Sequence, residues 1–185
     1  MTIFVLSVTI YIVTLKTGVI KMGIYTVSFF GHRKIENPSD IENRLDDILY
    51  DIITKNEYVE FLIGRDGDFD LLASSVIKRA IHKYGYGNTS FILVLPYMNA
   101  RYRDNKHSYL AYYDEVEICA ESAKAHYKSA IQIRNRKMVE RSDLVICYIQ
   151  HRSGGAYKTI QYDEKKNCKI VDLAYNNGIR SVTIF

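Results

Sequence analysis

Short apolar runs alternate along this chain with longer segments in which apolar residues recur every three or four positions. The short runs are rich in β-branched residues and end in polar or glycine-containing loops, a pattern typical of buried strands. The longer segments have the spacing of amphipathic helices. Regular alternation of the two predicts an α/β protein with a mostly parallel sheet. The expected strands span residues 24–30, 59–63, 90–95, 116–119, 144–149 and 169–173.

Local signals place the ends of the expected helices. The first should begin at residues 38–40, with Ser39 or Asp40 as its cap, and keep its apolar face as far as Ile52. The second, over 71–84, should end with Gly85 as its C-cap. Further helices are expected at 127–141 and 156–166, followed by a tail at 175–185 with an edge strand at 181–185.

Three of the expected strands lead directly into loops that contain glycine. These loops are Gly31-His32-Arg33, the stretch from Gly64 to Asp70, and Ser153-Gly154-Gly155. Glycine lets a backbone approach an anion closely, and the N–H groups at a helix N-terminus point toward it. The carboxyl ends of parallel strands meet at one edge of a sheet, where ligands bind. We therefore expect the three loops to build one ligand crevice.

Length and composition narrow the class of protein. A chain of 185 residues favours one domain with a sizeable core, and 48% hydrophobic with 25% charged residues is ordinary for a globular protein. The formal net charge of +4 permits a phosphorylated ligand or nucleic acid as partner without requiring either. Three cysteines without a CxxC pair predict small buried thiols in a reduced, cytoplasmic protein, with no metal and no cofactor: Cys119, Cys147 and Cys168.

The first 21 residues differ from the rest. Residues 3–15 are almost wholly apolar but too short to span a membrane, and no basic region precedes them as in a signal peptide, so we expect no membrane partner. The codons for Gly18–Met22 can include a ribosome-binding site ahead of Met22. We hypothesise that Met22 is the native start, that residues 1–21 are a non-native or disordered extension, and that a single domain spans 22–174. A natively expressed protein whose intact mass includes residues 1–21 would refute this.

Two of the loops carry candidate ligand-binding side chains. Arg33 can place a guanidinium on a phosphate or carboxylate, or stay solvated on an exposed loop. His32 can titrate near neutrality or serve as a hydrogen-bonded structural residue. The second loop has aspartates at alternating positions, but it lacks the bidentate glutamate of a calcium loop and follows a strand. Its aspartates can cap the following helix or bind a ribose hydroxyl. They are Asp66, Asp68 and Asp70.

Two further segments mix basic and other polar residues. Arg134-Asn135-Arg136 lies in an expected helix, where consecutive side chains point about 100° apart, so only one or two of them can face the crevice. Residues 97–113 combine tyrosines with Arg, Lys and His. They could stack bases or close over a ligand. We favour an irregular surface excursion whose tyrosines contact the sheet edge.

Taken in order, these motifs resemble the SLOG superfamily of Rossmann-like proteins, which includes DprA and the "lonely guy" phosphoribohydrolases. The chain is most similar to a bacterial branch of small SLOG proteins, which share Phe-x-Gly-His-Arg (Phe29–Arg33) and Arg-Asn-Arg-x-Met-Val (Arg134–Val139). They also share a Gly-x-x-x-Gly-Phe-Asp loop, matched at Gly64–Asp70 except that Asp68 replaces a glycine, and Ser-Gly-Gly-x-x-x-Thr at Ser153–Thr159. The resemblance covers residues 24–174 and implies a Rossmann-like three-layer α/β/α sandwich.

One motif departs from the phosphoribohydrolases. Their Pro-Gly-Gly-x-Gly-Thr-x-x-Glu ends in a catalytic glutamate, but Tyr162 stands three positions beyond Thr159 here, and Glu164 comes two residues late. The resemblance therefore implies binding of a nucleotide or nucleotide-derived phosphorylated molecule in a sensing or regulatory role, rather than catalysis. The alternatives are an N-glycosidic hydrolase acting on nucleoside monophosphates, and a DprA-like nucleic-acid-binding module, which the modest charge does not favour. Homodimerisation is left open.

The residues expected to bind the ligand come from all three loops and from the helix at 127–141. They are Gly31, His32, Arg33, Gly64, Asp70, Arg134, Asn135, Ser153, Gly154, Gly155 and Thr159.

Overall fold

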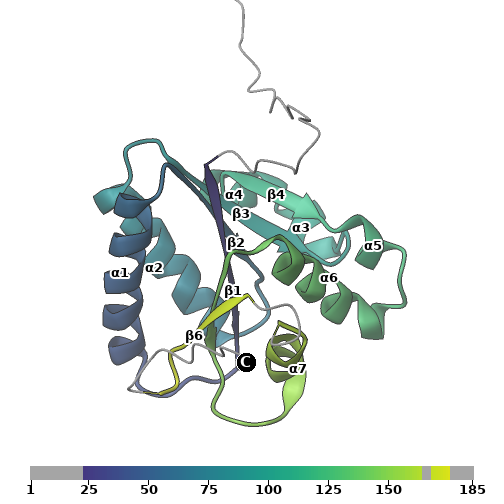
Figure 1. Cartoon of the computed structure of the whole chain (residues 1–185). Helices are drawn as coiled ribbons and strands as arrows, with labels where there is room; N and C mark the ends of the chain where they lie inside the picture. Colours follow the sequence, from purple (N-terminus) through teal and green to yellow (C-terminus); the bar gives the residue numbers. More distant parts are fainter. Residues whose placement is uncertain (1–22, 164–167, 176–185) are drawn as a thin grey trace, which may run out of the picture.

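A six-stranded sheet, parallel throughout, forms the centre of the computed structural model, which describes residues 23–163 and 168–175 (Figure 1). The strand order is β4-β3-β2-β1-β5-β6. The strands are β1 (Ile24–Gly31), β2 (Tyr58–Ile63), β3 (Thr89–Leu95), β4 (Glu115–Ile118), β5 (Leu144–Tyr148) and β6 (Lys169–Asp172). All six expected strands are confirmed, each within one residue at either end.

Helices cover both faces of the sheet and complete three layers (Figure 1). Helices α1 and α2 share one apolar core with the sheet, and α6 and α7 share a second core on the opposite face. This arrangement confirms the expected Rossmann-like α/β/α class. The helices are α1 (Pro38–Lys55), α2 (Asp68–Tyr84), α3 (Ala100–Asp104), α4 (Lys106–Tyr112), α5 (Ala120–Ala123), α6 (Tyr127–Arg141) and α7 (Gly154–Asp163).

The helix ends differ from the expected caps at two places. Asn37, not Ser39 or Asp40, precedes α1, in a left-handed conformation with φ 49°, and its carbonyl accepts from the N–H groups of Asp40 and Ile41. The α2 helix begins after Gly67, and neither Asp68 nor Asp70 caps it. Gly85 is confirmed as the C-cap of α2, since its N–H donates to the carbonyl of Ile81.

The tyrosine-rich segment 97–113 is more regular than expected. It forms α3 and α4 rather than an irregular excursion. Tyr102, Tyr109 and Tyr113 are buried in the core that α1 and α2 share with the sheet. The expectation that the tyrosines serve packing is thus confirmed for these three. Among the cysteines, Cys119 and Cys147 are buried and Cys168 is half-buried.

The order of the strands determines where the loops meet. The chain runs outward from β1 through β2 and β3 to β4, and then returns to place β5 on the other side of β1. Where the chain leaves two neighbouring parallel strands toward opposite sides of the sheet, a crevice forms between their carboxyl ends. The loops that follow β1, β2 and β5 therefore lie around one point.

Several expectations fall on residues outside the described part of the chain. These are the extension at 1–21, the end of the last helix beyond residue 163, Glu164, and the edge strand at 181–185. Within the described part, none of the helices is both long and apolar enough to cross a membrane.

Candidate functional site

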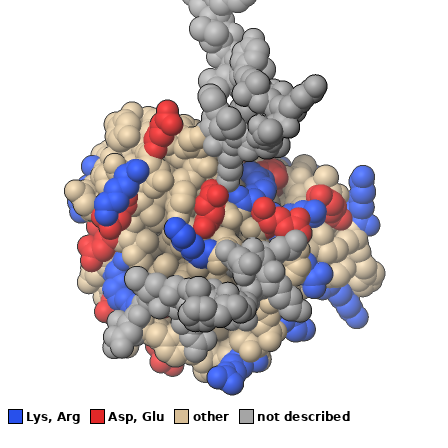
Figure 2. All heavy atoms as spheres, viewed as in Figure 1, with Lys and Arg blue, Asp and Glu red and all other residues tan. Residues whose placement is uncertain are grey.

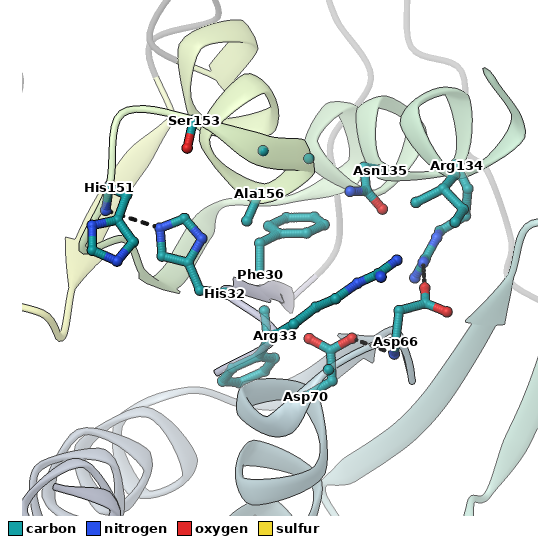
Figure 3. A pocket seen from close by; sticks show the side chains of 16 residues that line it. Phe30, His32, Arg33, Asp66, Asp70, Arg134, Asn135, His151, Ser153 and Ala156 are labelled. Atoms are coloured by element: carbon teal, nitrogen blue, oxygen red, sulfur yellow. Dashed lines mark hydrogen bonds and ion pairs between the residues drawn. The ribbon is translucent and has the colours of Figure 1, made fainter. Parts of the chain in front are cut away.

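A cleft of about 380 Å³ lies at the carboxyl ends of β1, β2 and β5, where the reversal in strand order predicts it (Figure 3). Its walls come from the loops after these strands and from the N-terminal half of α6 and the first turn of α7. Most of the residues expected to bind a ligand line it: Gly31, His32, Arg33, Asp70, Arg134, Asn135, Ser153, Gly154 and Gly155. The other two, Gly64 and Thr159, lie behind the wall. Gly64 leaves room for Arg134, and Thr159 forms a hydrogen bond with Asn135.

Arg33 extends into the cleft from the loop after β1. In Figure 3 its side chain lies between Asp70 and Asn135. The side chain is exposed, and its guanidinium has no hydrogen bond or ion pair with any described residue. Its backbone is held, because the Arg33 carbonyl accepts from the N–H of Asp68 at 3.0 Å. A Cβ on Gly67 would come within 2.8 Å of the Cα of Arg33, so glycine is needed there for the two loops to meet.

The first turn of α7 forms the opposite wall. The sequence placed Gly154 and Gly155 in a loop before the helix, but they are its first two residues. Gly154 has φ +87°, a conformation that glycine adopts without strain. The first N–H groups of a helix have no partner within the helix, and the helix dipole makes this end positive. The cleft therefore combines a guanidinium that has no partner among the described residues with a helix N-terminus, both suited to an anion.

Arg134 is a buried cation at one end of the cleft. Only 3% of its side chain is exposed, and its Nη2 donates to Asp66 Oδ2 at 2.6 Å, while its Nε has no partner. Gly64 makes room for this guanidinium, because a Cβ at Gly64 would lie 2.4 Å from Arg134 Nη1. Gly64 thus serves as a spacer for a cleft residue, a role different from the expected contact with a ligand.

Asn135 lies beside Arg134 on α6 and is also buried. Its Nδ2 donates to Thr159 Oγ1 at 3.0 Å, and Thr159 in turn donates to the carbonyl of Gly155 at 3.0 Å. This chain of bonds ties α6 to the first turn of α7, so Thr159 positions the wall from behind. Asn135 Oδ1 has no hydrogen-bond partner. A buried amide oxygen without a partner is costly, and a donor on a bound ligand would satisfy it.

Asp70 is the other buried polar group of the cleft. Burial raises its pKa to about 6, although the hydrogen bond from the Asp66 N–H at 2.9 Å and the positive charge of Arg134 both lower it. No described residue forms a close ion pair with it. A carboxyl group with a raised pKa in a cleft is a common feature of functional sites.

Two histidines close one end of the cleft. The backbone N–H of His151 donates to His32 Nε2 at 3.0 Å, and the centres of the two rings lie 5.5 Å apart (Figure 3). Burial and the neighbouring His151 lower the pKa of His32, so its neutral, accepting form is favoured. His32 is therefore a hydrogen-bonded structural residue, one of the two roles predicted for it, and it also lines the cleft. His151 was not singled out from the sequence, because it lies outside the Ser-Gly-Gly motif. Asp66, one of the three aspartates considered as helix caps or ribose ligands, lines the cleft and pairs with Arg134.

Comparisons with known proteins give a likeness in structure only. No protein-family model matches the sequence, and no curated protein matches it either. The fold is similar to DNA processing protein A from Helicobacter pylori, described as binding single-stranded DNA, with a TM-score of 0.57 and 13% identity over 81% of this chain. It is also similar to DprA from Streptococcus pneumoniae, with a TM-score of 0.55 and 12% identity over 80% of this chain.

At these identities the likeness shows a shared fold and nothing finer. The chain spans 65% of the Helicobacter protein and 50% of the Streptococcus protein. Both neighbours belong to the protein group named in the sequence resemblance, so the fold implied by that resemblance is confirmed.

Proposed function

We propose that the cleft binds a nucleotide unit through its phosphate. The observation that carries this proposal is the guanidinium of Arg33, which has no partner among the described residues and lines the same cleft as the N-terminus of α7. A guanidinium offers parallel donors to a phosphate, and helix N–H groups offer fixed ones. Buried acceptors on Asp70 and Asn135 suit the hydroxyl or amino donors of a sugar or base.

Two forms of ligand meet this description. A segment of single-stranded DNA is favoured by the fold, since the Helicobacter protein of this fold is described as binding it. A free nucleotide or nucleotide-derived molecule, bound in a sensing or regulatory role, is favoured by the size of the cleft, whose 380 Å³ lies in the range of small-molecule pockets. The ordered motifs similar to SLOG proteins support both forms.

The surface charge bears on how a nucleic acid would be held. Lys and Arg side chains are interspersed with Asp and Glu on the face shown in Figure 2, and no broad basic area is visible there. The modest net charge favours binding in the cleft over non-specific attachment to an extended basic surface.

Replacing Arg33 tests the phosphate site. We expect the protein to bind nucleoside monophosphates more tightly than the matching nucleosides, and Arg33→Ala to weaken monophosphate binding by about 1.5–3 kcal/mol, the range for a charged hydrogen bond. Arg33→Lys keeps the charge but loses the parallel donors, so its loss should be smaller. Calorimetric titration with both ligand series measures this.

Each result has a distinct meaning. Equal affinity of the native protein for nucleosides and monophosphates would contradict the anion site. If Arg33→Ala kept the whole preference for the monophosphate, Arg33 would be excluded from the site while the α7 N-terminus could still hold the phosphate.

The alternative of an N-glycosidic hydrolase makes a different prediction. Tyr162 occupies the position of the catalytic glutamate, does not line the cleft, and donates from its hydroxyl to Glu140 at 2.6 Å. We therefore expect negligible release of free base from nucleoside monophosphates, measured by chromatography after long incubation. A turnover of about 1 per second, ordinary for an enzyme, would show that another carboxyl group, such as Asp70, acts in catalysis.

A further inference from the structure

A second, smaller hollow adjoins the cleft at the same edge of the sheet. It has a volume of about 120 Å³ and lies where β3 ends, bounded by Pro96, Tyr97 and the start of α3. It shares Arg134, Asp66 and Ile131 with the cleft. Since β3 lies next to β2 in the sheet, the hollow continues the line of loops that starts at β5 and β1.

Three arginines line this hollow, and two of them, Arg65 and Arg101, have no carboxylate partner among the described residues. Arg65 is half-buried with its guanidinium 4.9 Å from the centre of the Tyr109 ring, and its Nε has no hydrogen-bond partner. Arg101 is exposed and forms no ion pair with a described residue. Buried Arg134 forms the boundary between the two hollows and has an Nε without a partner. With Arg33, these side chains form a row of cations along the edge of the sheet.

Aromatic residues hold part of this row in place. Tyr109, on which Arg65 stacks, is buried and contacts Tyr102 at 5.4 Å between ring centres. The tyrosines of α3 and α4 thus fix the position of a cation as well as filling the core. Tyr97 also lines the hollow, and an aromatic residue beside a cationic groove is a means of holding a base.

We infer that the ligand passes from the cleft beyond the Arg134–Asp66 ion pair into this second hollow, where Arg65 and Arg101 bind its next phosphate. The ligand is then a run of at least two nucleotides joined by a phosphodiester. This inference rests on the proposed binding of a nucleotide unit in the cleft. It assigns the segment after β3 to recognition, which the sequence allowed beside the favoured packing role.

The test compares ligands of increasing length by calorimetry: AMP, ADP, the 5′-phosphorylated dinucleotide pApA and octa-adenylate, together with their deoxy counterparts. We expect pApA or its deoxy form to bind about ten-fold or more tightly than the monophosphate, the effect of one charged hydrogen bond. Arg101→Ala should remove most of this gain and leave the affinity for the monophosphate unchanged. Both results are needed to support the inference.

A matched control lies on the same helix. Arg103 is also an exposed arginine of α3, but it pairs with Asp104 at 2.9 Å and does not line the hollow. Arg103→Ala should therefore change no affinity. Octa-adenylate binding much more tightly than pApA identifies the ligand as a nucleic-acid strand, whereas equal affinities identify a dinucleotide.

Other outcomes overturn the inference. If the monophosphate binds with an Arg33-dependent preference but pApA binds no better, the second subsite does not exist and the proposed function stands. If ADP matches pApA, the ligand has two phosphates on one nucleotide, and the dinucleotide class is wrong. If none of the ligands binds, the proposed function fails together with the inference.

Discussion

Gly155→Val should lower nucleotide affinity by more than about 100-fold while the protein stays folded. Gly155 lies in the first turn of α7 and lines the cleft, so a β-branched side chain would occupy the space through which a phosphate approaches the helix N–H groups. The fold should tolerate the change. A Cβ at Gly155 meets only the end of the Gln132 side chain, at 3.0 Å, and a flexible side chain can move aside.

The comparison with Gln161→Val isolates the effect of position. Gln161 is an exposed residue on the same helix and does not line the cleft, so this variant adds valine to α7 without touching the candidate anion site. Urea unfolding should show both variants within about 1 kcal/mol of the native protein, the usual scale for an exposed helical substitution. Calorimetry should show loss of binding for Gly155→Val alone. Native affinity in Gly155→Val would exclude the α7 N-terminus from the site.

Asp70→Asn should stabilise the protein at neutral pH by about 2–3 kcal/mol. Burial raises the pKa of Asp70 from 3.8 to about 6, so the folded state binds its proton more tightly than the unfolded state does. Below pH 4 the Asp70 carboxyl is protonated in both the folded and the unfolded state, so it does not lower the stability of the fold. As pH rises through the window from about 4 to 6, stability is lost, and the full shift corresponds to about 3 kcal/mol. A neutral amide avoids this loss.

Unfolding at pH 4 and pH 7.5 measures the difference. The two proteins should have similar stability at pH 4 and diverge at pH 7.5, where only the native protein holds a buried carboxylate. Asp68→Asn is the control, because Asp68 is exposed in the same first turn of α2 and should cost at most about 1 kcal/mol through the helix dipole. If Asp70→Asn is instead destabilising at pH 7.5, the hydrogen bond from the Asp66 N–H and the charge of Arg134 together outweigh the burial of Asp70.

The cost of an ionised Asp70 has a functional implication. The ionised form of Asp70 destabilises the fold at neutral pH, and Asp70 shares its cleft with an unpartnered Asn135 Oδ1. Both features suit groups whose role is to bind a ligand. Binding of a ligand that donates to these acceptors should therefore stabilise the folded protein more in the native form than in Asp70→Asn.

The helices and strands, and the edge of the sheet at which the loops lie, could be predicted from the sequence alone. Strand and helix periods are local properties, because side chains alternate in a strand and repeat every 3.6 residues in a helix. A glycine at the end of β1 and another directly after β2 marked two loops at the carboxyl edge. Local signals were less reliable at helix ends, where Asn37 and Gly67 replaced the expected caps and Gly154 began a helix rather than preceding one.

Which side chains meet could not be predicted in this way, because it depends on how distant segments pack together. Arg134 pairs with Asp66 across 68 positions of sequence, and His151 donates to His32 across 119. Such contacts depend on β5 returning to lie beside β1, and no local period encodes strand order. The same holds for the pKa of Asp70, which burial raises, and for Gly64, which leaves space for a guanidinium from a distant helix. Burial and proximity are properties of the folded chain, so the contacts and the pKa values of the cleft cannot be predicted from local sequence.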